Sequence, residues 1–156
     1  IDGLSAASYS LAAHIIERQK DHAVARFSAV GHKASVRQSV WETFSPGTVV
    51  FLRAVFARSV AGFSALGARA KPAERVAEEA ADALLEFLQT PATVDSHAAD
   101  QLLTLAALAP GQSCYVTDRA TEHLHTNAAV VRELTGREIC VEPTGPGEAV
   151  TVTVAA

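Results

Sequence analysis

The 156-residue sequence has no methionine and only two cysteines, Cys114 and Cys140. It contains neither a Cys-x-x-Cys nor a His-Glu-x-x-His motif, so its spacings do not favour a structural zinc site. Both cysteines lie in strand-like runs, and we expect two buried thiols in a reducing compartment. Because the sequence begins at Ile1 and lacks methionine, we expect a piece of a longer polypeptide.

Long apolar runs are also missing. No run reaches the ~18 residues of a membrane span, and no basic start followed by an apolar core marks a signal peptide. Hydrophobic residues make up 49% of the chain and charged residues 19%, which is typical of a globular protein. The net charge of −4 excludes a strongly basic surface, so any nucleic-acid contact should be local. We expect a cytoplasmic protein without a membrane partner.

The first 91 residues predict a mixed sheet with two helices on one face. Helical spacing of apolar residues indicates one helix, which Gly31 can end in the left-handed conformation. Pro72 and Glu74 suit the first turn of a second helix. Residues 1–11 suggest a strand entering a helix, and β-branched and aromatic residues predict further strands. The expected order is β-α-β-β-β-α, with a helix at 12–30, strands at 33–44, 48–58 and 60–66, and a helix at 72–89.

The remaining residues, 92–156, predict a second unit of the order α-β-α-β-β. Apolar periodicity and turn residues place its elements at 97–109, 113–118, 124–135, 138–143 and 148–154. About 65 residues make a thin unit to bury a core alone. The fold class is therefore α/β (α+β), with a division near residue 92.

His123 is the first candidate for chemistry. It lies where a strand leads into a helix, and backbone N–H groups at a helix N-terminus bind phosphate. A neutral histidine there can act as a nucleophile or base. Its spacing also allows a histidine without function near a helix cap. His125 follows two residues later, and two such side chains diverge on a helix, which argues against a shared metal.

Asp100 and Gln101 are the second candidates. Both are expected in the first turn of a helix that continues as LLTLAALA. The helix dipole explains an aspartate there but not a glutamine. Two interpretations stay open: polar residues of a first turn, or a carboxylate and an amide that contact a base, a ribose or a phosphate-bound water.

Two motifs together give the chain a resemblance. VDSHAADQLLTLAALAPGQS, followed by TEHLHTNAAVVRELTG, resembles the C-terminal part of RNA 3'-terminal phosphate cyclases. The shared elements are Ala-Asp-Gln-Leu at residues 99–102 and His-x-x-Thr-Asn at residues 123–127. The stretch SALGARAKPAERVAEEA, residues 64–80, resembles the link into the last helix of that family's inserted domain.

The resemblance implies an organisation. Residues 1–91 would be the inserted small α/β domain. Residues 92–156 would be the last repeat of the cyclase body, in a fold resembling the C-terminal domain of translation initiation factor 3. The N-terminal half of such a protein would lie outside this chain and would be its partner in the active site.

The resemblance also implies an adenylylating, ligase-type reaction on RNA 3'-phosphate ends, with ATP as substrate and a divalent metal such as Mg²⁺ or Mn²⁺. His123 would carry AMP as the nucleophile, His97 would stack on adenine, and Asp100 and Gln101 would line the nucleotide site. His125 has no assigned role. The alternatives are a non-catalytic relative in ribosome biogenesis, although such relatives lack the histidine, an inert fragment, or a simple binding module.

Overall fold

The computed structural model describes all residues from 1 to 156. The chain folds into two compact units, residues 1–86 and 87–156, and each is described by itself. The division falls in the last turn of helix α2 (Ala73–Leu88). No helix combines the length and the apolar character that crossing a bilayer requires.

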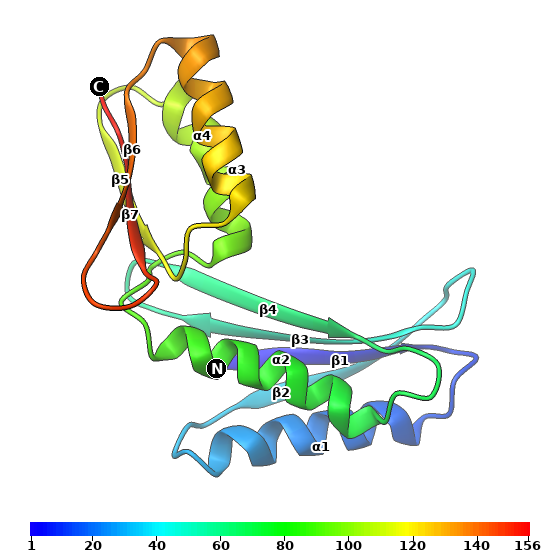
Figure 1. Ribbon diagram of the computed structural model, residues 1–156. Helices are drawn as coiled ribbons and strands as arrows, with labels where there is room; N and C mark the ends of the chain where they lie inside the picture. Colours follow the sequence, from blue (N-terminus) through cyan, green and yellow to red (C-terminus); the bar gives the residue numbers. More distant parts are fainter. The chain divides into compact units, whose positions relative to one another are not determined.

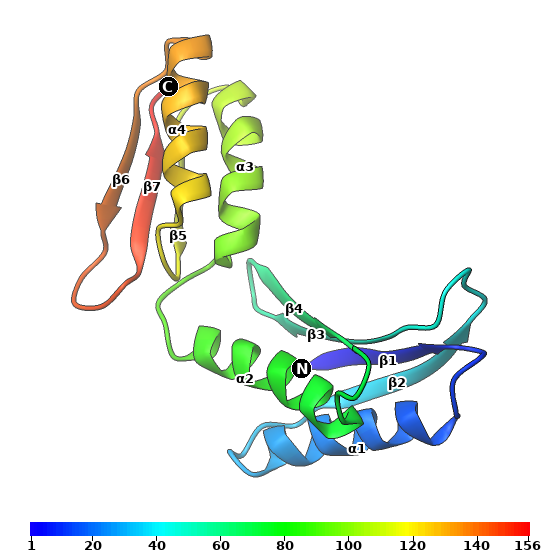
Figure 2. The ribbon, with the colours of Figure 1, turned by 45° about the vertical axis from the view of Figure 1, so that its right-hand side comes forward.

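The first unit is a four-stranded sheet with two helices on one face (Figures 1 and 2). The strand order is β2-β1-β3-β4, in which β1 and β2 are parallel and the other neighbours antiparallel. Helix α1 makes the crossover between the parallel strands, as such a pair requires. The elements before α2 are β1 (Asp2–Ser8), α1 (His14–Ser28), β2 (Ser35–Trp41), β3 (Thr48–Val55) and β4 (Val60–Leu66).

Alternation along β3 divides the sheet into two faces. Val50, Leu52 and Ala54 are buried beneath the helices, while Phe51, Arg53 and Val55 are exposed on the opposite face. Since side chains alternate along every strand, residues paired across neighbouring strands lie on the same face, and the whole sheet has one helix-covered face and one opposite face. Helix α1 buries one stripe of its side chains against the sheet. Gly31, beyond the end of the helix, has a φ of 81°, the left-handed conformation that the sequence predicts. The ion pairs Arg18–Glu74 and Arg26–Asp82 join the two helices.

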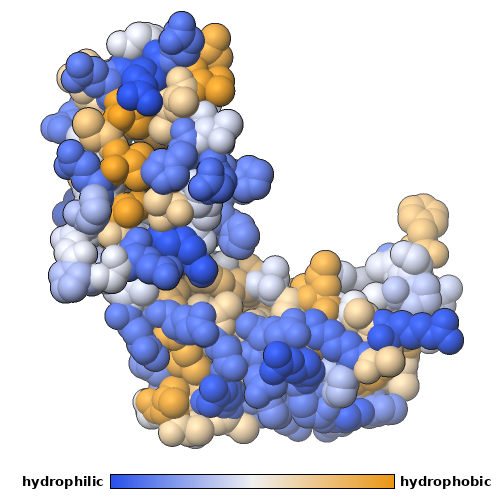
Figure 3. All heavy atoms as spheres, in the orientation of Figure 1, coloured by the Kyte–Doolittle hydropathy of each residue, from blue (hydrophilic) through white to orange (hydrophobic).

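The second unit packs two helices on one face of a three-stranded antiparallel sheet of order β5-β7-β6 (Figure 2). Its core contains Leu103, Leu124, Val152 and Val154, all at most 1% exposed. Apolar residues of the helices also remain on the surface (Figure 3), among them Leu105, Leu108 and Leu134. The elements are α3 (Ser96–Leu108), β5 (Ser113–Thr117), α4 (Glu122–Thr135), β6 (Ile139–Pro143) and β7 (Val150–Val154).

The structure confirms the mixed α/β class and the expected order of elements, β-α-β-β-β-α followed by α-β-α-β-β. The prediction of buried cysteines is wrong, because Cys114 and Cys140 are both exposed. Each lies opposite Thr153 of the central strand β7, on the sheet face away from the helices. A strand separates them, so their backbones are about 10 Å apart, beyond the reach of a disulfide.

Candidate functional site

The beginnings of α3 and α4 lie at the same end of the second unit. Strand β5 connects the two helices and runs opposite to both, so α3 and α4 point the same way side by side (Figures 1 and 2). Each helix has a partial positive charge at its N-terminus. A carboxylate of the chain already caps α3, so the start of α4 is the one better suited to a negatively charged ligand.

Asp95 fixes the start of α3. Its carboxylate, in a residue only 8% exposed, accepts hydrogen bonds from the backbone N–H groups of His97 (3.0 Å) and Ala98 (2.9 Å). The N–H groups of Thr93 and Val94 donate to the Val116 carbonyl, which ties this start to the end of β5. The cap and the strand together therefore set the position of the first turn.

Asp100 and Gln101 lie in the second turn of α3, whereas the sequence predicts the first turn. Helix α3 begins at Ser96, and its first turn contains no acidic residue. The prediction that both side chains occupy the first turn is therefore wrong, because the capping residue is Asp95. The helix dipole therefore does not explain Asp100 either, since its effect fades beyond the first turn.

The three predicted nucleotide-binding residues share one side of α3. His97 precedes Asp100 by three residues and Gln101 by four, and such positions are neighbours on a helix surface. His97 and Gln101 are exposed, and Asp100 is half-buried. The helix therefore presents an imidazole, a carboxylate and an amide to one ligand-sized area.

His123 lies in the first turn of α4. The Thr121 hydroxyl caps this helix by accepting from the Leu124 N–H at 3.1 Å. Thr126 and Asn127 follow His123 by three and four residues, so the residues of the His-x-x-Thr-Asn motif lie on one side. His125, two residues on, points away from that side. The exposed imidazole of His123 thus lies beside helix-terminal N–H groups and a hydroxyl and an amide.

The loop between β5 and α4 adds a charged pair. The Arg119 guanidinium donates to the carboxylate of Asp118 at 3.1 Å, and Asp118 also accepts a long hydrogen bond from the buried Thr117 hydroxyl. This loop leads within three residues to the cap of α4. It connects the end of the sheet, where α3 is tied, to the turn that carries His123.

Tyr115 connects the sheet to α3 and was not singled out from the sequence. Its hydroxyl donates to the Ala99 carbonyl at 2.6 Å. Burial, and secondarily the negative charge of Asp100, raises the pKa of Tyr115 to about 12. Alternation along β5 could have indicated this role, because it directs Tyr115 and Thr117 to the helix side of the sheet and Cys114 to the other side.

No group of three or more His, Cys, Asp or Glu side chains in the chain could hold a metal ion. His123 and His125, the nearest pair in sequence, diverge on α4. The residues of this chain therefore do not fit a complete site for the expected divalent metal.

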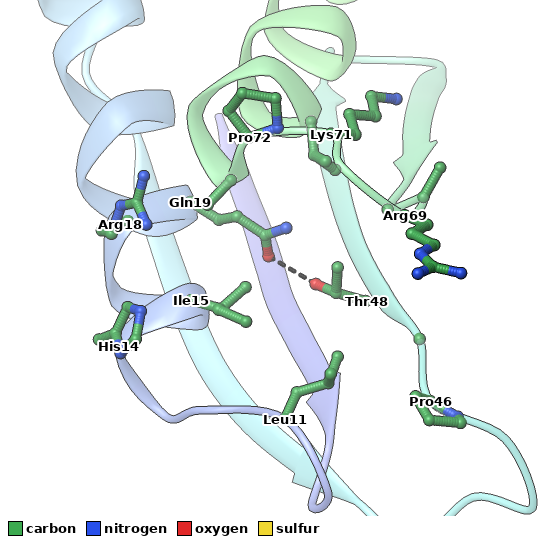
Figure 4. Close-up of a pocket in the computed structure, with 15 residues that line it drawn as sticks. Leu11, His14, Ile15, Arg18, Gln19, Pro46, Thr48, Arg69, Lys71 and Pro72 are labelled. Atoms are coloured by element: carbon green, nitrogen blue, oxygen red, sulfur yellow. Dashed lines mark hydrogen bonds between the residues drawn. The ribbon is translucent and has the colours of Figure 1, made fainter.

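A separate cavity of about 490 Å³ lies in the first unit, between α1 and the turn before α2 (Figure 4). The buried Gln19 amide faces it. Its oxygen accepts from the hydroxyls of Ser5 (2.9 Å) and Thr48 (2.8 Å), and its nitrogen has no partner. Arg18 and Lys71 at the cavity are paired with Glu74 and Glu79, which neutralise them. The cavity is therefore less cationic than its residues suggest.

Comparison with known proteins identifies the family. The family model described as RNA 3'-terminal phosphate cyclase, insert domain, matches residues 1–89, more than half of the chain. The chain belongs to the RNA 3'-terminal phosphate cyclase family. This confirms the resemblance found in the sequence.

Individual cyclases match a larger part of the chain. The RNA 3'-terminal phosphate cyclase of Methylococcus capsulatus is 43% identical over 78% of this chain and 34% of its own length. Those of Saccharolobus solfataricus and Hyperthermus butylicus are 39% and 41% identical, over 85% and 86% of this chain and 39% of each relative. Matches this long extend beyond the insert region into the second unit. The chain thus spans well under half the length of these cyclases.

Proposed function

We propose that this chain is the nucleophile-bearing C-terminal part of an ATP-dependent RNA 3'-terminal phosphate cyclase. One observation supports this most. In a chain of the cyclase family, His123 lies in the first turn of α4, on the same side as Thr126 and Asn127. In this proposal residues 1–91 are the inserted domain, and residues 92–156 are the last repeat of the cyclase body.

The proposed reaction begins at His123. A neutral imidazole nitrogen bonds to the α-phosphorus of ATP, the bond to the bridging oxygen breaks, and pyrophosphate leaves. The product is a histidine–AMP phosphoramidate. The first N–H groups of α4 face the developing negative charge, which is the kind of fixed donor that stabilises a phosphoryl transition state.

Two further transfers complete the reaction. An oxygen of the RNA 3'-phosphate bonds to the AMP phosphorus, and the phosphorus–nitrogen bond breaks to restore His123. The neighbouring 2'-hydroxyl then attacks the 3'-phosphorus, loses its proton and releases AMP, which leaves a 2',3'-cyclic phosphate. The chain forms no complete metal site, so none of these steps is assigned to Mg²⁺ or Mn²⁺.

The side of α3 is proposed to hold the nucleotide. His97 is exposed at the first turn and offers an imidazole plane for stacking on adenine. Asp100 and Gln101, one turn further, offer an acceptor and an amide that both accepts and donates to a base or a ribose. The shared side of the three residues supports a single ligand area.

Covalent labelling tests the nucleophile. The full-length protein that contains this chain, incubated with ATP labelled at the α-phosphate and a divalent metal, should acquire an acid-labile, base-stable label. The substitution His123→Ala should abolish it. His125→Ala is the matched control, because His125 is also exposed and lies two residues away on the same helix. Labelling that survives His123→Ala would contradict the assignment.

A second candidate is that the 156 residues alone are inert. The lengths favour it, because the chain covers only 34–39% of the three relatives above. Labelling of the full-length protein but not of the 156-residue chain would support it. Labelling of both would exclude it.

A further inference from the structure

The sheet of the first unit has one face that no helix of that unit covers, and we call it the open face. Register aligns its side chains in rows across the four strands. One row is Arg37–Leu4–Phe51–Ser64, and the next is Ser39–Ala6–Val49–Leu66. Apart from its aromatic and aliphatic residues, this face carries mainly small and hydroxyl side chains.

Phe51 lies on β3, one of the two central strands, and is 41% exposed. Its ring extends over Gly62 of the neighbouring strand: a Cβ at Gly62 would meet two ring carbons at 3.0 Å. The glycine therefore leaves room for the ring to lie against the sheet. Its other side faces solvent, as a surface on which a planar ligand can stack.

Trp41 forms a second aromatic position on the same face. It is 43% exposed and borders a cavity of about 260 Å³. Ala6 and Val49 line this cavity as apolar residues, and at its border lie Ser8 and Thr43, whose hydroxyls hydrogen-bond to each other at 2.8 Å. An apolar slot with an aromatic wall suits the flat apolar faces of a nucleobase.

The charge of the open face favours an anionic partner. Its one carboxylate on the strands, Asp2, receives two hydrogen bonds of 3.0 Å from Arg53. The hydrogen bonds of Arg53, and more weakly the charge of Arg37, hold the pKa of Asp2 below its usual value. Arg37 has no such carboxylate partner and is exposed. The face therefore has a net positive charge on a chain whose net charge is −4.

We propose that the open face binds single-stranded RNA, with one base stacked on Phe51 and another held beside Trp41. By register the two aromatics are four residues and two strands apart, or about 16 Å. This is several times the ~3.4 Å between stacked bases, so they contact non-adjacent nucleotides. Arg37 contacts a phosphate between them. Stacking on aromatics with cations at the backbone is a general mode of single-strand binding.

The choice of RNA rests on the proposed function, in which the substrate is an RNA end. The face itself involves none of the residues proposed to carry AMP. Binding should therefore depend little on the terminal phosphate and little on base identity, because every base can stack.

Binding of a fluorescein-labelled, ten-nucleotide oligouridine with a 3'-hydroxyl end to the 156-residue chain tests the proposal. Trp41 is the only tryptophan, so the unlabelled oligonucleotide should quench the intrinsic emission over the same concentrations that raise the anisotropy of the labelled one. Phe51→Ala should weaken binding about tenfold or more. Arg37→Gln should reduce the salt dependence by about one counterion.

Phe44→Ala is the matched control, because Phe44 is fully exposed on the loop between β2 and β3 and should leave affinity unchanged. Absence of quenching in the unsubstituted chain, or equal losses for Phe44→Ala and Phe51→Ala, would overturn the proposal and leave the face to a protein partner. His123→Ala should not alter this binding. A protein that binds oligouridine through Phe51 but is never adenylylated would refute only the proposed activity.

Discussion

Tyr115 links the sheet of the second unit to helix α3 by one hydrogen bond. Its hydroxyl donates to Ala99, and Asp100 follows Ala99 in the helix. The neutral phenol is the form that suits this environment, because both burial and the Asp100 carboxylate oppose the phenolate. The hydrogen bond holds the turn of α3 that carries Asp100 and Gln101.

We therefore predict that alkaline pH destabilises the second unit through Tyr115. Its pKa is about 12 when folded, against about 10 when unfolded, so the unfolded chain loses the proton first. The stabilisation is complete below about pH 10 and is lost as the pH rises through about 12. Tyrosinate absorbance in a Tyr9→Phe background reports Tyr115 alone, because the chain has two tyrosines.

Tyr115→Phe supplies the comparison. It removes one hydrogen bond and should lower the free energy of unfolding by about 1 kcal/mol at neutral pH. Because the phenol is gone, the free energy of unfolding of this variant should fall less steeply above pH 10. If the substituted and unsubstituted proteins lose stability in parallel across that range, another group titrates and the prediction fails.

At the residue scale, local motifs were enough to propose site residues, but not to predict the hydrogen bonds around them. His123, Asp100 and Gln101 could be selected because their motifs are local. The cap at Asp95 and the hydrogen bond of Tyr115 could not, since one depends on the helix starting at Ser96 and the other on strand register. Neither the catalytic role of His123 nor the nucleotide role of His97 is tested by the geometry, and both stay predictions.

Strand β1 determines the order of the first sheet. It is a central strand, parallel to β2 and antiparallel to β3, and its residues are mostly small. At Gly3 the neighbouring strand comes so close that an added Cβ would lie 2.6 Å from the Phe51 carbonyl oxygen and 2.8 Å from a Leu52 methyl. A side chain there must push the two strands apart.

We predict that Gly3→Ala destabilises the first unit by roughly 2 kcal/mol or more, because the clash is with backbone that cannot rotate away. Urea unfolding followed by Trp41 fluorescence measures this, since the only tryptophan lies in β2 beside β1. Gly47→Ala is the control within the same unit: a Cβ there meets no atom within 4 Å, and the φ of Gly47 is not in the left-handed region. Equal effects of the two substitutions would contradict the close approach.

Element order was predictable because apolar periodicity and turn residues are encoded locally. The orientation of strands was harder to predict. Cysteines in strand-like runs suggest buried thiols, but Cys114 and Cys140 both lie opposite Thr153 on the face away from the helices, and a shift of one residue in register decides that face. Pairing of β1 with both β2 and β3 is a long-range property that no single segment specifies.

The whole molecule has two cores rather than one. Phe27, Leu52 and Leu84 are fully buried in the first unit, and Leu103, Leu124 and Val152 in the second. Two cores imply two separately cooperative regions, with a division near the end of α2. The proposed domains, residues 1–91 and 92–156, place the cut in the loop between α2 and α3.

We predict that residues 1–91, expressed alone, unfold in urea with the same Trp41 midpoint as the 156-residue chain. The reason is that every strand of the first sheet, both of its helices and its ion pairs Arg18–Glu74 and Arg26–Asp82 lie within this segment. A control ending at residue 72 removes α2, with its buried Val76 and Leu84, and should lose the cooperative transition. A lower midpoint for residues 1–91 would mean that the first core depends on residues beyond the cut.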